Sequence, residues 1–148
     1  MRLSKKNKEI LTDEFAFIID QMKNSEDPEE MLYYYSAVYG ILRRIVNLEF
    51  SQDLLFAYLT TEKTYQTIME RFGAMKMGKS VATFHENFGP KFIEYTEELM
   101  TGFFDSKLRL KSLTKIVTLA YTTTGNGFYL TKKGMIDIFD DKKELKDK

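Results

Sequence analysis

The stretch that decides the fold is DPEEMLYYYSAVYGILRRIVN, which runs from Asp27 to Asn47. Its start has the features of a helix N-terminus, because an aspartate side chain can accept a hydrogen bond from a first-turn N–H and proline fits the first helical position. The apolar residues that follow recur every three or four positions, which is typical of one helix face. They form one continuous row: Met31, Tyr35, Val38, Leu42 and Ile45. We therefore predict a helix over residues 28–47.

Two further apolar rows flank the first one and leave little polar surface on this helix. The rows consist of Tyr34, Ile41 and Leu48 and of Leu32, Tyr39 and Val46. What remains is one narrow stripe of polar or small residues: Tyr33, Ser36, Gly40, Arg43 and Asn47. A helix this apolar is usually surrounded by other helices or shared with a partner subunit. We expect neighbours to enclose it on nearly all sides.

The same apolar surface makes a homodimer the working hypothesis. The predicted interface consists of the apolar residues that would face a partner protomer: Tyr34, Val38, Ile41 and Ile45. The alternative is a central helix that is covered entirely by neighbours within one chain.

The composition limits the classes of protein to which the chain can belong. Its 148 residues suit one domain, spanning residues 1–148, and 43% hydrophobic with 30% charged residues is a globular composition. Basic and acidic residues balance at 22 each, so no overall field attracts nucleic acid or an anionic membrane. The chain has no cysteine, no apolar run long enough to span a membrane and no signal-peptide core. We expect a cytoplasmic protein without disulfides.

Helical spacing recurs along most of the chain. The predicted helices cover residues 4–23, 28–47, 52–72, 80–104 and 106–121. The fourth crosses Gly89-Pro90, and a kink is expected there because proline removes a backbone hydrogen bond. Long helices with short turns are typical of an up-and-down bundle, and Gly73 to Lys79 supplies a glycine-rich connection between the third and fourth. We predict an all-α antiparallel bundle of four long helices, with residues 106–121 extending it or packing across it.

The C-terminal segment has a different pattern. Gly125-Asn126-Gly127 is a turn signal that favours a tight hairpin, with Phe128-Tyr129-Leu130 as the return strand, although a plain loop between helices fits equally well. Thr131 can cap a short last helix with the sequence GMIDIFDD. Residues 142–148 are expected to form a frayed tail.

Residues 73–80 read GAMKMGKS and match the pattern G-x-x-x-x-G-K-[ST]. The segment resembles the Walker A loop of P-loop nucleotide hydrolases, whose backbone N–H groups cradle phosphates. The resemblance implies a loop bounded by Gly73 and Gly78, with Lys79 at the terminal phosphates and Ser80 on Mg²⁺. The preceding residues have helical rather than strand spacing. Two alternatives therefore remain: a plain loop between helices, or a loop and helix N-terminus that bind phosphate without hydrolysis.

Residues 128–134 read FYLTKKG. They resemble the segment between the wing and the last helix of winged-helix regulators, which often reads Tyr-x-Leu-Thr-x-x-Gly. The resemblance implies that the wing contacts DNA and that residues 106–121 form the recognition helix. Its basic residues would be Lys107, Arg109, Lys111 and Lys115. Because the net charge is zero, DNA binding is kept as an alternative.

Candidate catalytic and metal-binding residues are few. His85 is the only histidine, which excludes zinc sites made of His and Cys and paired Glu-x-x-His sites, so we interpret it as structural. Two groups of carboxylates have the oxygen ligands that Mg²⁺ prefers, but their spacing is also ordinary on a solvated helix face. They are Asp137, Asp140 and Asp141 and Glu94, Glu97 and Glu98. We predict no metal site and no catalytic residue.

These observations favour an oligomeric interaction module or small-ligand-binding module over an enzyme. A DNA-binding regulator and a phosphate or nucleotide binder are the alternatives. The expected partner is a second copy of the chain, no membrane is expected, and the sequence indicates no particular cofactor.

Overall fold

The computed structural model describes residues 2–76, 88–122, 128–131 and 134–137 of the chain. These parts form five helices and one two-stranded antiparallel sheet. The helices are α1 (Lys5–Lys23), α2 (Pro28–Leu48), α3 (Gln52–Lys76), α4 (Phe88–Thr101) and α5 (Ser106–Thr122). The strands are β1 (Phe128–Thr131) and β2 (Gly134–Asp137). The prediction of a helical protein is confirmed, and no helix in the described ranges is long and apolar enough to cross a membrane.

Side chains at the helix starts explain where the first three helices begin. The Asp27 carboxylate accepts a hydrogen bond of 2.8 Å from the backbone N–H of Glu30, and Pro28 opens α2, which confirms the predicted start. The Ser51 hydroxyl accepts from the Leu54 N–H in the same way at the start of α3. In α1 the Ser4 hydroxyl accepts from Asn7 N–H. These bonds satisfy donors that have no partner within the helix.

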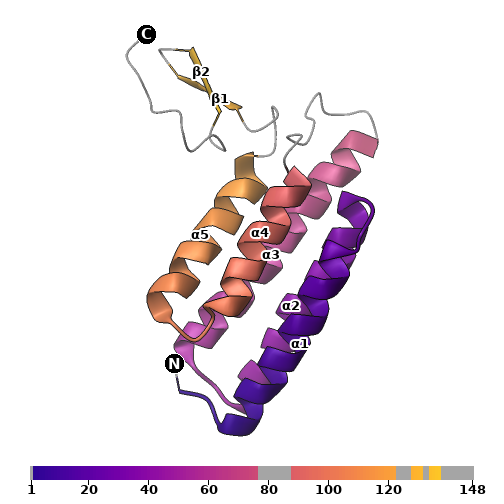
Figure 1. Cartoon of the computed structure of the whole chain (residues 1–148). Coiled ribbons are helices and arrows are strands. Elements are labelled where there is room, and N and C mark those ends of the chain that lie inside the picture. The colour runs from indigo at the N-terminus through magenta and orange to yellow at the C-terminus, as the bar shows by residue number, and fades with distance from the viewer. Residues whose placement is uncertain (1, 77–87, 123–127, 132–133, 138–148) are drawn as a thin grey trace.

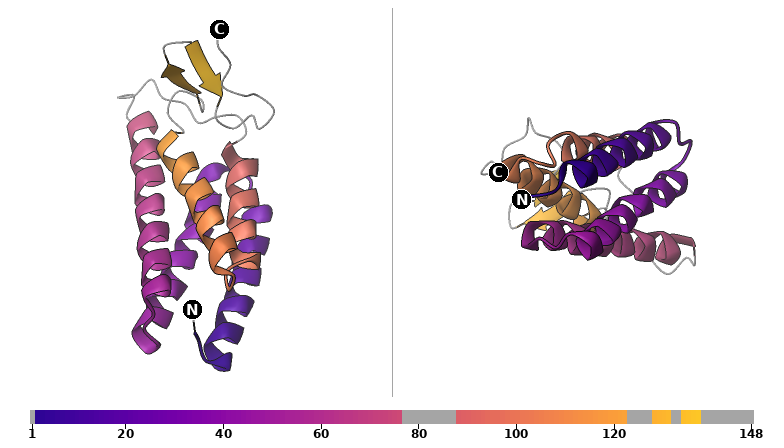
Figure 2. Two further views of the ribbon diagram at one scale, coloured as in Figure 1. Left: turned by 90° about the vertical axis from the view of Figure 1, so that its left-hand side faces the viewer. Right: turned by 90° about the horizontal axis from the view of Figure 1, so that it is seen from below.

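The five helices lie side by side, and the hairpin lies beyond the end of α5 (Figures 1 and 2). Contacts between elements run from α1 to α2, from α2 to α3, from α3 to α5, from α5 to α4 and from α4 back to α1. A further contact joins α2 to α4 across the interior. The fifth helix is therefore a full member of the packing arrangement, because it covers both α3 and α4.

The core is built on one face of α2. Tyr35, Val38, Leu42 and Ile45 have no exposed surface, so most of the predicted apolar row is confirmed. Met31 is only half-buried, and Leu32 takes its place in the core. The other helices contribute similar rows, including Phe15, Leu54, Phe92 and Leu119.

Helix α2 is less enclosed than expected. Tyr33, Gly40 and Arg43 of the predicted polar stripe are exposed, but so are Ala37 and Leu48, which lie outside that stripe, and Leu48 is 62% exposed. Tyr34, Ile41, Tyr39 and Val46 are half-buried. Helix α2 packs mainly against α1, α3 and α4, and one face of it remains at the surface. The apolar spacing identified the row that faces the core, but it overestimated how much of the α2 surface the neighbouring helices bury.

The boundaries of α3 and α4 also differ from the prediction. Helix α3 continues past Phe72 and through Gly73 to Lys76, because a glycine lowers helix stability without ending a helix by itself. Helix α4 begins at Phe88 and ends at Thr101, with Pro90 in its first turn, where a missing N–H costs little. The predicted helical start at residue 80 lies outside the described ranges, and so do residues 81–87, which would form the part of the helix before the predicted kink at Gly89-Pro90.

A hairpin is present, but it differs from the predicted one. β1 pairs with β2 in the register Phe128↔Asp137 to Thr131↔Gly134, so its turn falls at residues 132–133 rather than at Gly125-Asn126-Gly127. The prediction of a short helix over GMIDIFDD is therefore wrong for Gly134–Asp137. A short apolar run of this kind fits a strand as well as a helix. The predicted tail at residues 142–148 lies outside the described ranges.

Two polar contacts fix helix ends to other parts of the fold. The Glu49 carboxylate accepts hydrogen bonds from the Ser4 backbone N–H at 2.7 Å and from the Asn7 side chain, and these bonds hold the pKa of Glu49 below its usual value. At the other end of the molecule, the Arg71 guanidinium donates to the backbone carbonyls of Ala120 and Tyr121, at 2.9 and 3.2 Å. Arg71 thus supplies donors from α3 to the last turn of α5.

Hydroxyl groups in the core are mostly satisfied by their own helices. Thr61, Thr64 and Thr96 are fully buried or nearly so, and each donates to a backbone carbonyl one turn earlier. The Tyr35 hydroxyl is the exception among the described residues, because it is buried without a hydrogen bond of normal geometry. Burial raises the pKa of Tyr35, while the neighbouring Thr64 hydroxyl acts in the opposite direction.

Replacing Tyr35 by Phe should raise the free energy of unfolding by about 1 kcal/mol, because a buried hydroxyl without a partner is removed. The ring would keep its contact with Phe92, whose centroid lies 4.7 Å away. Urea unfolding measures the change. Tyr33→Phe is the matched control and should have no effect, since Tyr33 is 70% exposed. A loss of stability on Tyr35→Phe would show that the hydroxyl has a partner after all.

Candidate functional site

The GAMKMGKS segment is only partly described by the structure. Gly73 lies within α3, and the helix continues through the next three residues of the pattern. Gly78, Lys79 and Ser80 lie outside the described ranges. A phosphate-binding loop needs consecutive backbone N–H groups that are not used in helix hydrogen bonds. The first half of the segment is therefore helical where the resemblance implies a loop, and phosphate binding by the second half stays a prediction.

The predicted interface residues are divided between the core and its edge. Val38 and Ile45 have no exposed surface within the single chain, so they have no surface to offer to a partner protomer. Tyr34 and Ile41 are half-buried and pack against the core. An interface on α2 would have to use the outward face that carries Tyr33 instead.

The predicted carboxylate group on α4 is dispersed among different partners. Glu94 pairs with Lys91, Glu97 with Lys23 on α1 and Glu98 with Lys115 on α5. Side chains that point to three different partners do not converge on one ion, and the described residues contain no group of three metal-ligand side chains. Asp137 lies in β2, whereas Asp140, Asp141 and His85 lie outside the described ranges.

The basic residues that would serve a recognition helix on α5 are also partly engaged. Arg109 is 5% exposed, its guanidinium donates to the Phe103 carbonyl at 2.7 Å, and it pairs with Asp53 at 3.3 Å. A guanidinium held in this way cannot reach a DNA phosphate. Lys115 pairs with Glu98, which leaves Lys107 and Lys111 exposed.

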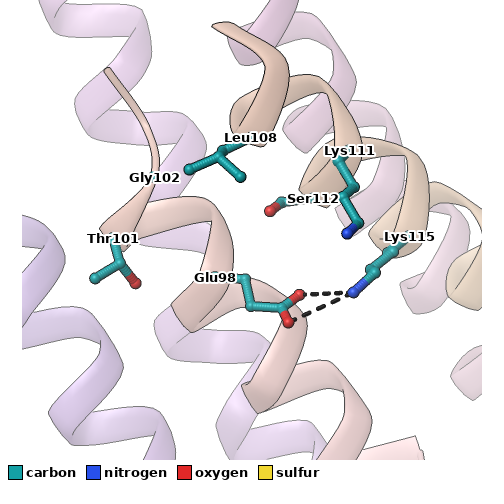
Figure 3. Close-up of a pocket in the computed structure, with 7 residues that line it drawn as sticks. All are labelled: Glu98, Thr101, Gly102, Leu108, Lys111, Ser112 and Lys115. Carbon is teal, nitrogen blue, oxygen red and sulfur yellow. Dashed lines mark hydrogen bonds and ion pairs between the residues drawn. The ribbon is translucent and has the colours of Figure 1, made fainter. Parts of the chain in front are cut away.

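A pocket of about 280 Å³ lies between the end of α4 and the first turns of α5 (Figure 3). Its lining residues are Glu98, Thr101, Gly102, Leu108, Lys111, Ser112 and Lys115. The start of α5 is fixed by Asp105, whose carboxylate accepts from the backbone N–H groups of Lys107 and Leu108. This cap sets the turn between the two helices and so places the lysines of α5 opposite α4.

The pocket contains polar groups that can bind a ligand. Ser112 is only 4% exposed, and it lines the pocket. Figure 3 shows its oxygen directed into the pocket. Lys111 and Lys115 lie one turn apart on the same wall, and Lys115 binds both oxygens of Glu98 at 3.1 and 3.4 Å. Lys111 has no ion-pair partner in the part of the chain that the structure describes.

Gly102 allows the close contact that forms the apolar wall. A Cβ at this position would lie 2.8 Å from the Leu108 Cβ and 3.3 Å from the Glu98 carbonyl oxygen. Distances this short are repulsive, and a Cβ of Leu108 cannot move without its backbone. The turn after α4 therefore requires glycine at this position, and the sequence patterns singled out neither Gly102 nor Ser112.

We expect Gly102→Ala to destabilise the protein by about 1–3 kcal/mol, because the added methyl group forces α4 and α5 apart. The matched control is Gly40→Ala on the exposed side of α2, where a Cβ meets nothing within 4 Å. That change should stabilise the protein by about 0.5–1 kcal/mol, since alanine favours helix over glycine. Thermal unfolding of both variants measures the difference. Equal shifts in the two variants would contradict the proposed role of Gly102.

The comparisons with known proteins add no relative. No protein-family description, no curated protein and no solved structure matches the chain. The pocket between α4 and α5 is therefore interpreted from its own side chains.

Proposed function

We propose that the protein is a small-ligand-binding module that holds an anionic organic molecule in the pocket between α4 and α5. The observation that supports this most directly is that Lys111, Lys115 and Ser112 all line one pocket. Ammonium groups and a hydroxyl can each donate a hydrogen bond to a ligand oxygen. The volume of about 280 Å³ is near the lower end for ligand sites.

The charges of the pocket favour an anion. Lys111 supplies an ammonium group without an ion-pair partner in the described ranges. Lys115 has three donors, so it can keep Glu98 and still donate to a ligand. Leu108 offers an apolar wall next to these donors. A small carboxylate with an apolar body would satisfy all three features.

The fold proposed for this function is an antiparallel bundle in which α5 is an integral helix. Support comes from the contacts of α5 with both α3 and α4, which place its lysines beside the end of α4. The pocket needs this arrangement, because both of its walls are helix surfaces.

A homodimer remains a separate proposal. Its support is the exposed apolar side chains on α2 and in the turn after it, which are Tyr33, Leu48 and Phe50 at 70%, 62% and 66% exposure. Light scattering should then give twice the mass of one chain, and Tyr33→Glu should return the mass to that of one chain. A single-chain mass for the unchanged protein would remove the proposal.

DNA binding is less well supported than ligand binding. The one favourable observation is a hairpin that follows α5, as a wing follows a recognition helix. Against it, Arg109 is buried in an ion pair and α5 is packed on two sides. Duplex DNA binding with a steep salt dependence would be its signature.

Removal of the donors should weaken binding of small carboxylates. With benzoate or propionate as probe, we expect Lys111→Gln to reduce affinity about tenfold, because one hydrogen bond to a charged group is lost. Ser112→Ala should reduce it by a smaller factor. Isothermal titration measures both, and Lys63→Gln on the exposed surface of α3 is the matched control. Unchanged affinity in both pocket variants would contradict the proposed function.

A further inference from the structure

A second pocket lies on the other side of α4, against α1. It has a volume of about 300 Å³. Its lining residues are Thr12, Phe15, Ala16, Ile19, Glu97, Met100, Thr101 and Phe104. Thr101 also lines the pocket between α4 and α5, so the two pockets share this lining residue. Both therefore flank the last turn of α4.

The polar groups of this second pocket are already engaged. The Thr12 hydroxyl donates to the Lys8 carbonyl at 2.8 Å, and the Thr101 hydroxyl donates to the Glu97 carbonyl. The Glu97 carboxylate pairs with Lys23 across the groove at 2.5 Å. These interactions leave mainly apolar surface for a ligand. The second pocket thus suits a hydrocarbon group, whereas the first suits an anionic group.

Most of the residues that line this groove are apolar. Ile19 and Met100 are half-buried and pack against the core, while Phe104 is 41% exposed. Lys8 lies over the Phe104 ring at 5.8 Å from its centroid, so a cation borders the groove at that end. Ala16 is exposed and small, which keeps the α1 side open. A flexible alkyl chain can follow such a groove and remove its apolar surface from water.

We propose that the ligand is a single-chain amphiphilic carboxylate whose head and tail occupy the two pockets. The carboxylate binds Lys111 and Ser112 between α4 and α5. The hydrocarbon tail crosses α4 at Thr101, where the side chain is small, and lies in the groove between α1 and α4. This inference rests on the proposed function, because it uses the same anion-binding pocket for the head group.

The test is isothermal titration of the intact chain with butanoate, octanoate and dodecanoate, each below its micelle concentration. Affinity should rise about fourfold for each added methylene until the groove is filled, since each buried CH₂ contributes a similar increment. Ala16→Phe should remove this dependence on chain length and leave butanoate binding unchanged. Ala37→Phe, on the exposed face of α2, is the matched control. Lys111→Gln should weaken all three ligands, and 1-octanol should bind more weakly than octanoate.

The outcomes separate the inference from the function on which it rests. If all three carboxylates bind equally well and Ala16→Phe has no effect, the tail assignment is wrong while anion binding stands. If dodecanoate binding is blocked by Ala16→Phe but unaffected by Lys111→Gln and Ser112→Ala, the head assignment is wrong and so is the proposed function. If none of the carboxylates binds, both are overturned.

Discussion

Burial of one row of side chains on α2 is the constraint on which the other helices depend. Tyr35, Val38, Leu42 and Ile45 lose all their exposed surface, and no helix can cover its own apolar face. Each apolar side chain of this size contributes roughly 1.5–3 kcal/mol when it is fully buried. Three helices contact α2 to provide this cover. Helix α4 packs against α2 and α1, and α5 packs against α4. This order of packing places Lys111 and Lys115 of α5 beside the end of α4.

The sequence was sufficient for features that depend on neighbouring residues. The start of α2 follows from Asp27 and Pro28, which act within the first turn, and the buried row follows from the helical period. The period does not state how much of the circumference other helices will cover. That quantity depends on how many neighbours there are, and for this reason the exposure of Ala37 and Leu48 outside the polar stripe was not predicted.

On α3 two threonines are more deeply buried than the tyrosines near them. The structure buries Thr61 and Thr64 almost completely and leaves Tyr58 and Tyr65 half-buried. A buried threonine is tolerated because its hydroxyl bonds to its own helix, as both of these do. Hydrophobicity alone gives no weight to this local hydrogen bond, so it ranks these threonines below the tyrosines as core residues.

The candidate site was harder to predict than the helices. Its residues come from the end of one helix and the start of the next, and only the turn capped by Asp105 brings them together. A signal was present in the one-turn spacing of Lys111 and Lys115, but that spacing is common on exposed helices. The role of Gly102 depends on how close it lies to Leu108 in the folded protein, and the sequence does not give this distance.

The contact of Arg71 with α5 ties the end of that helix to α3. The last turn of α5 contains no basic residue of its own, so the cation that neutralises its negative dipole belongs to α3. The two carbonyls that Arg71 binds lie 49 and 50 residues away from it in the sequence. The end of α5 therefore depends on its packing beside α3.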